Sequence, residues 1–234
     1  MEKDLVFYEY NDKNYDKISN CLTENLKNRI KKLMYLYDYN KVMIICIGST
    51  KVEFDCFGPL TGSKLEKSIN NSNVKIYGTQ TNPINGSNIK TFLSEHANEI
   101  NESLIIVIDA TVTEIGSLGT ILVSNEGIYP GAGVGKNLPY VGDLSIKVPT
   151  SKPKTGTFNP NILKIDFTDP SIKKLATKRN AIDLYYSNFY YVLDSKDIVA
   201  IANIVSDSLT KALEKIFDTE KEPIENCKKL SFKL

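Results

Sequence analysis

The stretch of residues 42–62 constrains the fold more than any other part of this sequence. It begins with the apolar run Val42–Ile47 and continues through Gly48 and Asp55 to Pro59. A short run without polar residues is typical of a strand buried on both faces, as in a parallel sheet, and a proline is typical of the first turn of a helix. The stretch therefore predicts a buried strand, a loop that carries a carboxylate, and a helix. It places Asp55 at the sheet edge where open α/β folds keep their sites.

The chain then repeats this alternation of apolar runs and amphipathic stretches. The expected strands are 42–47, 74–79 and 104–108, and the expected helices between them are 59–69 and 88–100. The third strand ends on an acid, Asp109. Strands and helices in alternation are typical of an α/β fold with a doubly wound, mostly parallel sheet flanked by helices and joined by right-handed crossovers. Two further strands, 120–123 and 144–148, are expected on either side of a glycine-rich loop.

Two long helices are expected outside these strands. Apolar residues recur every three to four positions over 14–39 and again over 197–217, which is the pattern of a helix with one buried face. Basic residues lie between the apolar positions of the first helix, and acids and asparagines flank them, so they predict a solvated face rather than a nucleic-acid patch. Residues 149–193 are polar and proline-containing, then tyrosine-rich, and we expect a variable insert or flap there.

Composition narrows the class of protein. The 234 residues are 41% hydrophobic, which is enough for a core, and no linker divides them, so 1–234 is expected to be a single α/β domain. The 29 basic and 28 acidic residues nearly balance, which argues against direct binding to nucleic acid or to a membrane surface. The N-terminus does not resemble a signal peptide, and the four cysteines form no Cys-x-x-Cys pair. We expect a cytoplasmic protein with reduced thiols.

Asp55 and Asp109 are the candidate catalytic pair. If the second strand lies outside the first, strands 42–47 and 104–108 are neighbours, and the two acids face one crevice. Two close carboxyl groups share a proton, so that one polarises a water while the other protonates a carbonyl or a leaving group. This is the chemistry of an aspartic-type peptidase. From spacing alone an alternative stays open, in which Asp55 caps the following helix and Asp109 makes a turn.

The glycine-rich loop is a candidate substrate-binding loop, formed by Gly131, Gly133, Gly135 and Lys136. It does not fit a phosphate-binding loop, because the first glycine of that motif would have to stand where Pro130 is, and because neither Ser nor Thr follows the lysine. The glycines let the backbone turn tightly and approach a substrate or the sheet edge. Lys136 is either a fixed positive charge in this site or a solvated side chain.

The single histidine, His96, argues against several other mechanisms. It falls on the apolar face of the expected helix 88–100, where a core or half-buried role is expected rather than metal binding or proton transfer. Without a histidine beside a serine, threonine or cysteine, nucleophilic catalysis by a side chain is not expected. We expect neither a metal nor a cofactor.

Five motifs, in a consistent order, resemble one known family. They are 44–50 with 55–62, 77–79 with Pro83, 107–110, 130–134, and 138–139 with 141–146. Together they resemble the YyaC-type sporulation proteins, which are relatives of the germination protease of spore-forming bacteria. The resemblance covers residues 42–148 and fades after them, and the N-terminal helix is an addition to it.

The resemblance implies a fold shared with the hydrogenase-maturation peptidases, within the phosphorylase/hydrolase-like group. It also implies an aspartic-type endopeptidase that acts on small acid-soluble spore proteins in the forespore or spore interior, with Asp55 and Asp109 as its catalytic acids and no cofactor. Maturation peptidases use similar acids and a histidine to bind nickel, and His96 is placed on a core face. Two alternatives stay open, a non-catalytic spore-assembly or binding protein and a metal-dependent maturation peptidase. A homo-oligomer formed through the tyrosine-rich stretch also stays open.

Overall fold

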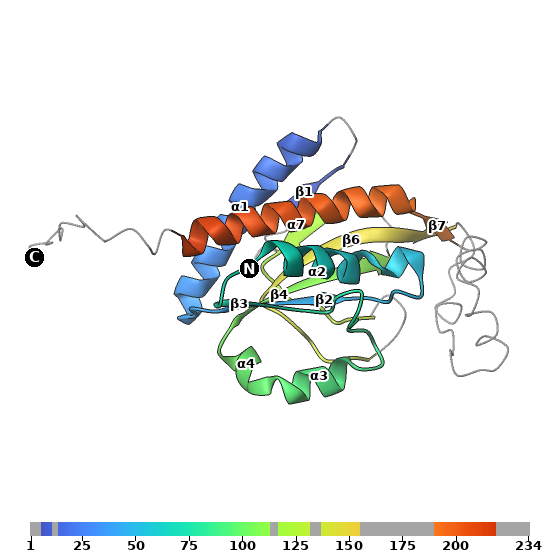
Figure 1. The fold of residues 1–234 in the computed structure, drawn as a ribbon. Coiled ribbons are helices and arrows are strands. Elements are labelled where there is room, and N and C mark those ends of the chain that lie inside the picture. The colour runs from blue at the N-terminus through green and yellow to red at the C-terminus, as the bar shows by residue number, and fades with distance from the viewer. Residues whose placement is uncertain (1–5, 11–13, 113–116, 132–136, 155–189, 219–234) are drawn as a thin grey trace, which may run out of the picture.

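The computed structural model describes residues 6–10, 14–112, 117–131, 137–154 and 190–218 (Figure 1). Its strands are β1 (Val6–Tyr8), β2 (Val42–Ile47), β3 (Val74–Tyr77), β4 (Leu104–Val112), β5 (Ile121–Ser124), β6 (Leu144–Pro153) and β7 (Tyr190–Val192). Its helices are α1 (Tyr15–Tyr37), α2 (Phe57–Ser68), α3 (Ile89–Glu95), α4 (Ala97–Asn101) and α7 (Ser195–Phe217), with a short 3-10 helix, η1 (Glu53–Asp55). Within these ranges, no helix is both long enough and apolar enough to cross a membrane.

The strands form one mixed sheet whose centre is parallel. Over the described residues it has seven strands in the order β1-β5-β6-β4-β2-β3, and β7 pairs with β6. The pairs β2-β3, β2-β4 and β4-β6 are parallel, whereas β1-β5, β5-β6 and β6-β7 are antiparallel. β2 lies between β3 and β4, so the first and third predicted strands are neighbours, as expected. The predicted α/β class, a mostly parallel sheet flanked by helices, is confirmed.

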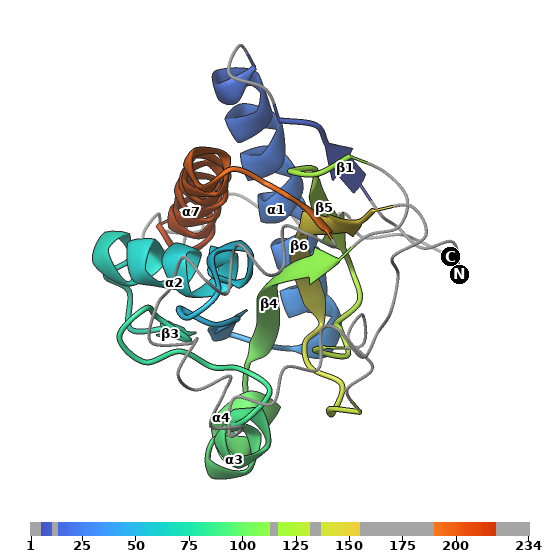
Figure 2. The ribbon, with the colours of Figure 1, turned by 90° about the vertical axis from the view of Figure 1, so that its right-hand side faces the viewer.

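Helices cover the two faces of the sheet unequally. The long helices α1 and α7 lie with α2 on one face, which we call the first face, and the short helices α3 and α4 lie on the second face (Figures 1 and 2). Side chains alternate along β4, so that Leu104, Ile106 and Ile108 pack in the core of the first face. Ile105 and Val107 pack in a separate, smaller core on the second face. The larger core therefore belongs to the long helices.

The two long helices follow the predicted pattern. Of the apolar side chains expected on the inner face of α1, Ile18, Leu22, Leu26, Ile30 and Leu33 are buried, whereas Tyr37, in the last turn, is 55% exposed. α7 begins after Asp194, whose carboxylate accepts a hydrogen bond from the backbone N–H of Lys196 at 2.9 Å. Each fully buried leucine or isoleucine contributes roughly 1.5–3 kcal/mol to stability before the ordering entropy is subtracted. The packing of α1 and α7 on the sheet is thus a main source of stability.

Two element boundaries differ from the prediction. β4 does not end on Asp109, because Ala110 and Thr111 continue to pair with β6. The expected helix 88–100 is divided into α3 and α4 at His96, whose ring Nδ1 lies 2.9 Å from the carbonyl oxygen of Phe92. The backbone of His96 has φ −107° and ψ 17°, which is outside the helical range.

The expected insert at 149–193 begins and ends in the sheet. Residues 149–153 belong to β6, and Tyr190–Val192 forms β7, which pairs with that end of β6. The residues between them, 155–189, lie outside the described residues, so a flap there stays a prediction. The first strand, β1, extends the sheet beyond β5 and was not expected from the sequence.

Candidate active site

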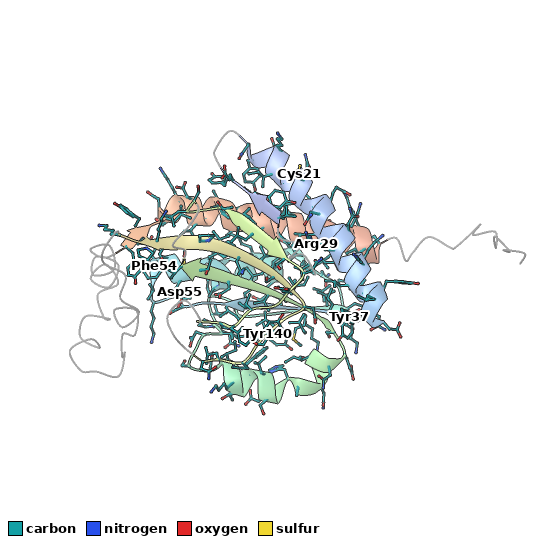
Figure 3. The ribbon with its side chains drawn as sticks, turned by 180° about the vertical axis from the view of Figure 1, so that it is seen from behind. Cys21, Arg29, Tyr37, Phe54, Asp55 and Tyr140 are labelled. Carbon is teal, nitrogen blue, oxygen red and sulfur yellow. The ribbon has the colours of Figure 1, made fainter. Side chains whose placement is uncertain are left out.

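A close-packed loop holds Asp55 at the end of β2. Gly48 follows that strand, and its φ of 151° lies where side chains are rarely tolerated. A Cβ atom on Gly48 would stand 2.2 Å from the carbonyl oxygen of Asp55, so only glycine lets these segments meet. The backbone N–H of Ser49 donates to the same oxygen at 3.0 Å. Figure 3 shows Asp55 and Phe54 at the end of the sheet toward which β4 and β6 run.

The start of α2 packs against the same strand end. A Cβ atom on Gly58 would stand 2.0 Å from the carbonyl oxygen of Ile47, so α2 begins in direct backbone contact with β2. The residue at the N-cap of α2 is Cys56. The alternative interpretation of the sequence made Asp55 the cap of this helix, but Asp55 stands one position before the N-cap.

Asp109 lies in the middle of the sheet, in β4. Its register partners are Ile47 on β2 and Lys147 on β6. Its neighbours in sequence, Ile108 and Ala110, pack against the first-face core, so the Asp109 side chain belongs to the second face. Adjacent strands lie about 4.8 Å apart, so Asp109 has an apolar side chain on one side and a lysine on the other.

The charges around Asp109 couple it to Asp55. Asp109 is half-buried as a residue, and protein atoms crowd around its carboxyl group. This desolvation raises its pKa well above the usual value, and the negative charge of Asp55 raises it further. A hydrogen bond from the backbone N–H of Ala110 and the charge of Lys147 lower it by less. The two predicted acids therefore lie close enough to influence each other, and Asp109 keeps its proton where a free aspartate has lost it.

Sequence reasoning missed Lys147. A strand was expected over 144–148, but no role was given to this lysine. The alternation of side chains along the strand could have revealed it. Ile146 and Val148 pack in the first-face core, so Lys147, between them, belongs to the second face. That it stands beside Asp109 depends on the register of β4 against β6, which the sequence alone does not reveal.

The predicted substrate-binding loop is described only in part. Gly131 has a φ of 70°, as a tight turn requires, whereas Gly133, Gly135 and Lys136 lie outside the described residues. The described residues that follow the loop pack on the second face, since a Cβ atom on Gly142 would stand 2.6 Å from Cγ2 of Val107, two residues before Asp109. The role of the loop in binding a substrate stays a prediction.

His96 takes a half-buried position beside Phe92 and Tyr77. Its ring stacks on Phe92 with centroids 4.3 Å apart and meets the edge of Tyr77 at 4.8 Å. The prediction of a core or half-buried histidine is confirmed in its half-buried form. In the part of the chain that the structure describes, no group of three or more His, Cys, Asp or Glu side chains is arranged to hold a metal ion.

Comparisons with known proteins identify the family. Residues 6–163, more than half of the chain, match the family described as Protein of unknown function (DUF1256), and the chain belongs to this family. Over 105 residues the chain is 33% identical to a Bacillus subtilis (strain 168) protein described as Uncharacterized protein YyaC. The match covers 45% of this chain and 51% of that protein, so the chain spans about half the length of this curated relative. The resemblance to YyaC-type proteins is confirmed, and the relation to the germination protease stays a prediction.

Among solved structures, the chain is similar to a NiFe hydrogenase maturation protease, HycI, from Thermococcus kodakarensis KOD1. The two share 12% sequence identity with a TM-score of 0.37, over 75% of this chain and 98% of the other. A likeness at this TM-score carries no conclusion about activity. The case for function therefore rests on the residues of this chain and on its family.

Proposed function

We propose that this protein is an endopeptidase in which Asp55 and Asp109 hydrolyse a peptide bond by acid–base catalysis. The coupling of the two carboxyl groups carries the proposal: they come from separate elements, η1 and β4, and the charge of Asp55 raises the pKa of Asp109. Acid–base pairs in enzymes are built from groups whose surroundings push their pKa values apart. Burial raises the pKa of Asp109 in this way.

The raised pKa of Asp109 supports one assignment of the two roles. In this assignment, Asp109 holds the proton and is the general acid, and Asp55 is the general base. Asp55 accepts a proton from a water molecule as the water oxygen bonds to the carbonyl carbon of the substrate. Asp109 gives its proton to the amide nitrogen as the carbon–nitrogen bond breaks. The elements of water are added across the bond, one carboxyl group gains a proton as the other loses one, and exchange with solvent restores the pair.

The proposed substrates are small acid-soluble spore proteins, cleaved in the forespore or spore interior. The motifs that resemble YyaC-type sporulation proteins support this choice. The glycine-rich loop that begins near Gly131 is proposed to approach the bound chain.

The proposal is tested by incubating small acid-soluble spore proteins with the purified protein between about pH 4 and about pH 9, with Asp55→Asn and Asp109→Asn variants alongside. Loss of a general acid or base lowers the rate by typically 10²–10⁴-fold, and we expect each variant to lose about that much. Asp143→Asn is the matched control. The carboxylate of Asp143 accepts a hydrogen bond from the backbone N–H of Ile105 at 2.8 Å, at the opposite end of β4, so cleavage is expected to persist.

Each outcome of this experiment separates the proposal from its rivals. Cleavage that persists unchanged in both Asn variants contradicts the pair. Absence of cleavage by the unmodified protein over the whole pH range contradicts a peptidase and favours a binding protein. Cleavage that a chelator abolishes and an added divalent metal restores contradicts metal-free hydrolysis and favours the maturation-peptidase alternative.

A further inference from the structure

Lys147 stands beside the proposed acid without a role in the mechanism so far. It is half-buried on β6, and its register partners are Asp109 on β4 and Leu122 on β5. Of its two cross-strand neighbours, then, one is a carboxylic acid and the other is apolar. Within the described residues, the side chains of Lys147 and Asp109 form no direct ion pair. The ammonium group therefore acts on the carboxyl group through its electric field.

Asp109 lies between two charges of opposite sign. The negative charge of Asp55, on η1, and the positive charge of Lys147, on β6, both act on its carboxyl group. Its partner on β2 is the uncharged Ile47. In the described part of the chain, no other charged side chain contributes to the ionisation of Asp109. Asp55 favours the protonated form of Asp109, and Lys147 favours the ionised form. Without Lys147, burial and Asp55 would still favour the protonated form of Asp109, and the N–H of Ala110 would be the remaining group that favours the ionised form.

We propose that Lys147 is a positioning residue of this site, whose ammonium group makes Asp109 release its proton more readily and sets the upper pH limit of the activity. This inference rests on the proposed function for its catalytic meaning. A general acid works best when it holds its proton at the working pH but does not hold it too tightly. Burial and Asp55 both weaken Asp109 as an acid, and Lys147 offsets a part of their effect.

The test compares Lys147→Met and Lys147→Arg in the full chain. The ionisation of Asp109 is followed by carbon-13 NMR of its carboxyl group, which is assigned by its disappearance in Asp109→Asn. An opposite charge within 4–6 Å lowers the pKa of a carboxyl group by 1–3 units and by less at longer range, so we expect the midpoint to rise by about 0.5 to 1 unit in Lys147→Met. Lys147→Arg keeps the charge and is expected to stay within about 0.3 unit of the unmodified protein.

Lys152→Met is the control, because Lys152 lies on the same strand but pairs with Tyr191 of β7. We expect it to leave the midpoint of Asp109 unchanged. A midpoint that does not move in Lys147→Met, or one that moves equally in Lys152→Met, overturns the inference. If Lys147→Met does not fold, as judged by circular dichroism, Lys147→Gln is a smaller neutral replacement with the same prediction.

Activity provides an independent readout. We expect the alkaline limb of the pH–rate profile to move to higher pH in Lys147→Met by the same amount as the NMR midpoint, and the maximal rate to fall. The NMR titration needs no substrate, so it tests the effect of Lys147 on Asp109 even if the protein proves to cleave nothing. A moved midpoint with an unmoved alkaline limb overturns the catalytic part of the inference, and leaves the proposed peptidase activity standing.

Discussion

The two faces of the sheet are built from the same strands but differ in what those strands carry. On the first face, β4 contributes Leu104, Ile106 and Ile108, and the apolar row continues with Ala110. On the second face, β4 contributes Ile105 and Val107, and the row is then interrupted by Asp109. The first face packs against two 23-residue helices, whereas the second is covered by helices of 7 and 5 residues. The apolar row of the second face therefore ends at the position where the proposed site lies.

The largest effect on stability is expected from a cavity in the first face. Ile106→Ala removes a fully buried side chain, and such changes cost about 2–5 kcal/mol. Ile105→Ala makes the same change at the next position, on the second face, where the smaller core can relax more easily. We expect its cost to be lower by about 1 kcal/mol, measured by urea denaturation. Equal costs would show that the two faces contribute alike.

Gly48→Ala is expected to lower stability by displacing the loop that holds Asp55, rather than by disturbing either core. The added Cβ atom would collide with the carbonyl oxygen of Asp55 at 2.2 Å, and the positive φ adds strain, so we expect a loss of about 2 kcal/mol or more. Gly119→Ala is the matched control, because φ is 80° there but the nearest atom is a side-chain carbon, Cδ1 of Ile201, at 3.1 Å. Denaturation curves of both variants measure the difference, and a smaller loss for Gly48→Ala would contradict the close-packed loop.

Asp109 is expected to make stability depend on pH. Its pKa in the folded protein is raised above the value of about 3.9 that it has in an unfolded chain. At a pH between the unfolded and the folded pKa, the folded state therefore binds more protons than the unfolded state. Stability therefore falls as the pH rises through this window. Asp109→Asn removes the ionisation, and we expect it to be more stable than the unmodified protein above the window and to lose that advantage below it. Thermal melts across pH test this, and parallel curves for the two proteins would refute it.

The smallest effect is expected where the short helices are tied to the sheet. The hydroxyl group of Tyr77 donates a hydrogen bond to Glu99 at 2.8 Å, and burial together with Glu99 raises the pKa of Tyr77 to about 12. Tyr77→Phe removes the hydrogen bond and keeps the ring against Phe92, so we expect a cost of about 1 kcal/mol. Tyr35→Phe, at a residue that is 91% exposed, is expected to change the denaturation midpoint very little. A comparable change in both variants would mean that the bond contributes nothing.

The sequence predicted the first face better than the second, for a physical reason. The buried faces of α1 and α7 are periodic over many residues, and the apolar runs of β2 and β4 have no other stable location than the centre of a sheet. The position of Asp55 after β2 followed from the same pattern. The features that the sequence did not predict depend on pairing between strands that are distant in sequence. β4 continues past Asp109 because it pairs with β6 there, and the same register places Lys147 beside Asp109.

The division of the expected helix 88–100 and the presence of β1 could not be predicted either. The apolar spacing of 88–100 fits one helix, but the ring of His96 interacts with the carbonyl oxygen of Phe92, and the helix divides there. β1 has three residues and too little alternation to be predicted, and its place depends on β5. Features of this kind depend on tertiary contacts that a periodic pattern does not contain.

The central claim is that Asp55 and Asp109 form one coupled pair, and titration of Asp109 in the Asp55→Asn variant tests it most directly. The carboxyl carbon of Asp109 is followed by NMR in the unmodified protein and in the variant. Because the charge of Asp55 raises the pKa of Asp109, its removal is expected to lower the midpoint of Asp109. A midpoint that is the same in both proteins would mean that the two acids ionise independently, and it would contradict a shared site.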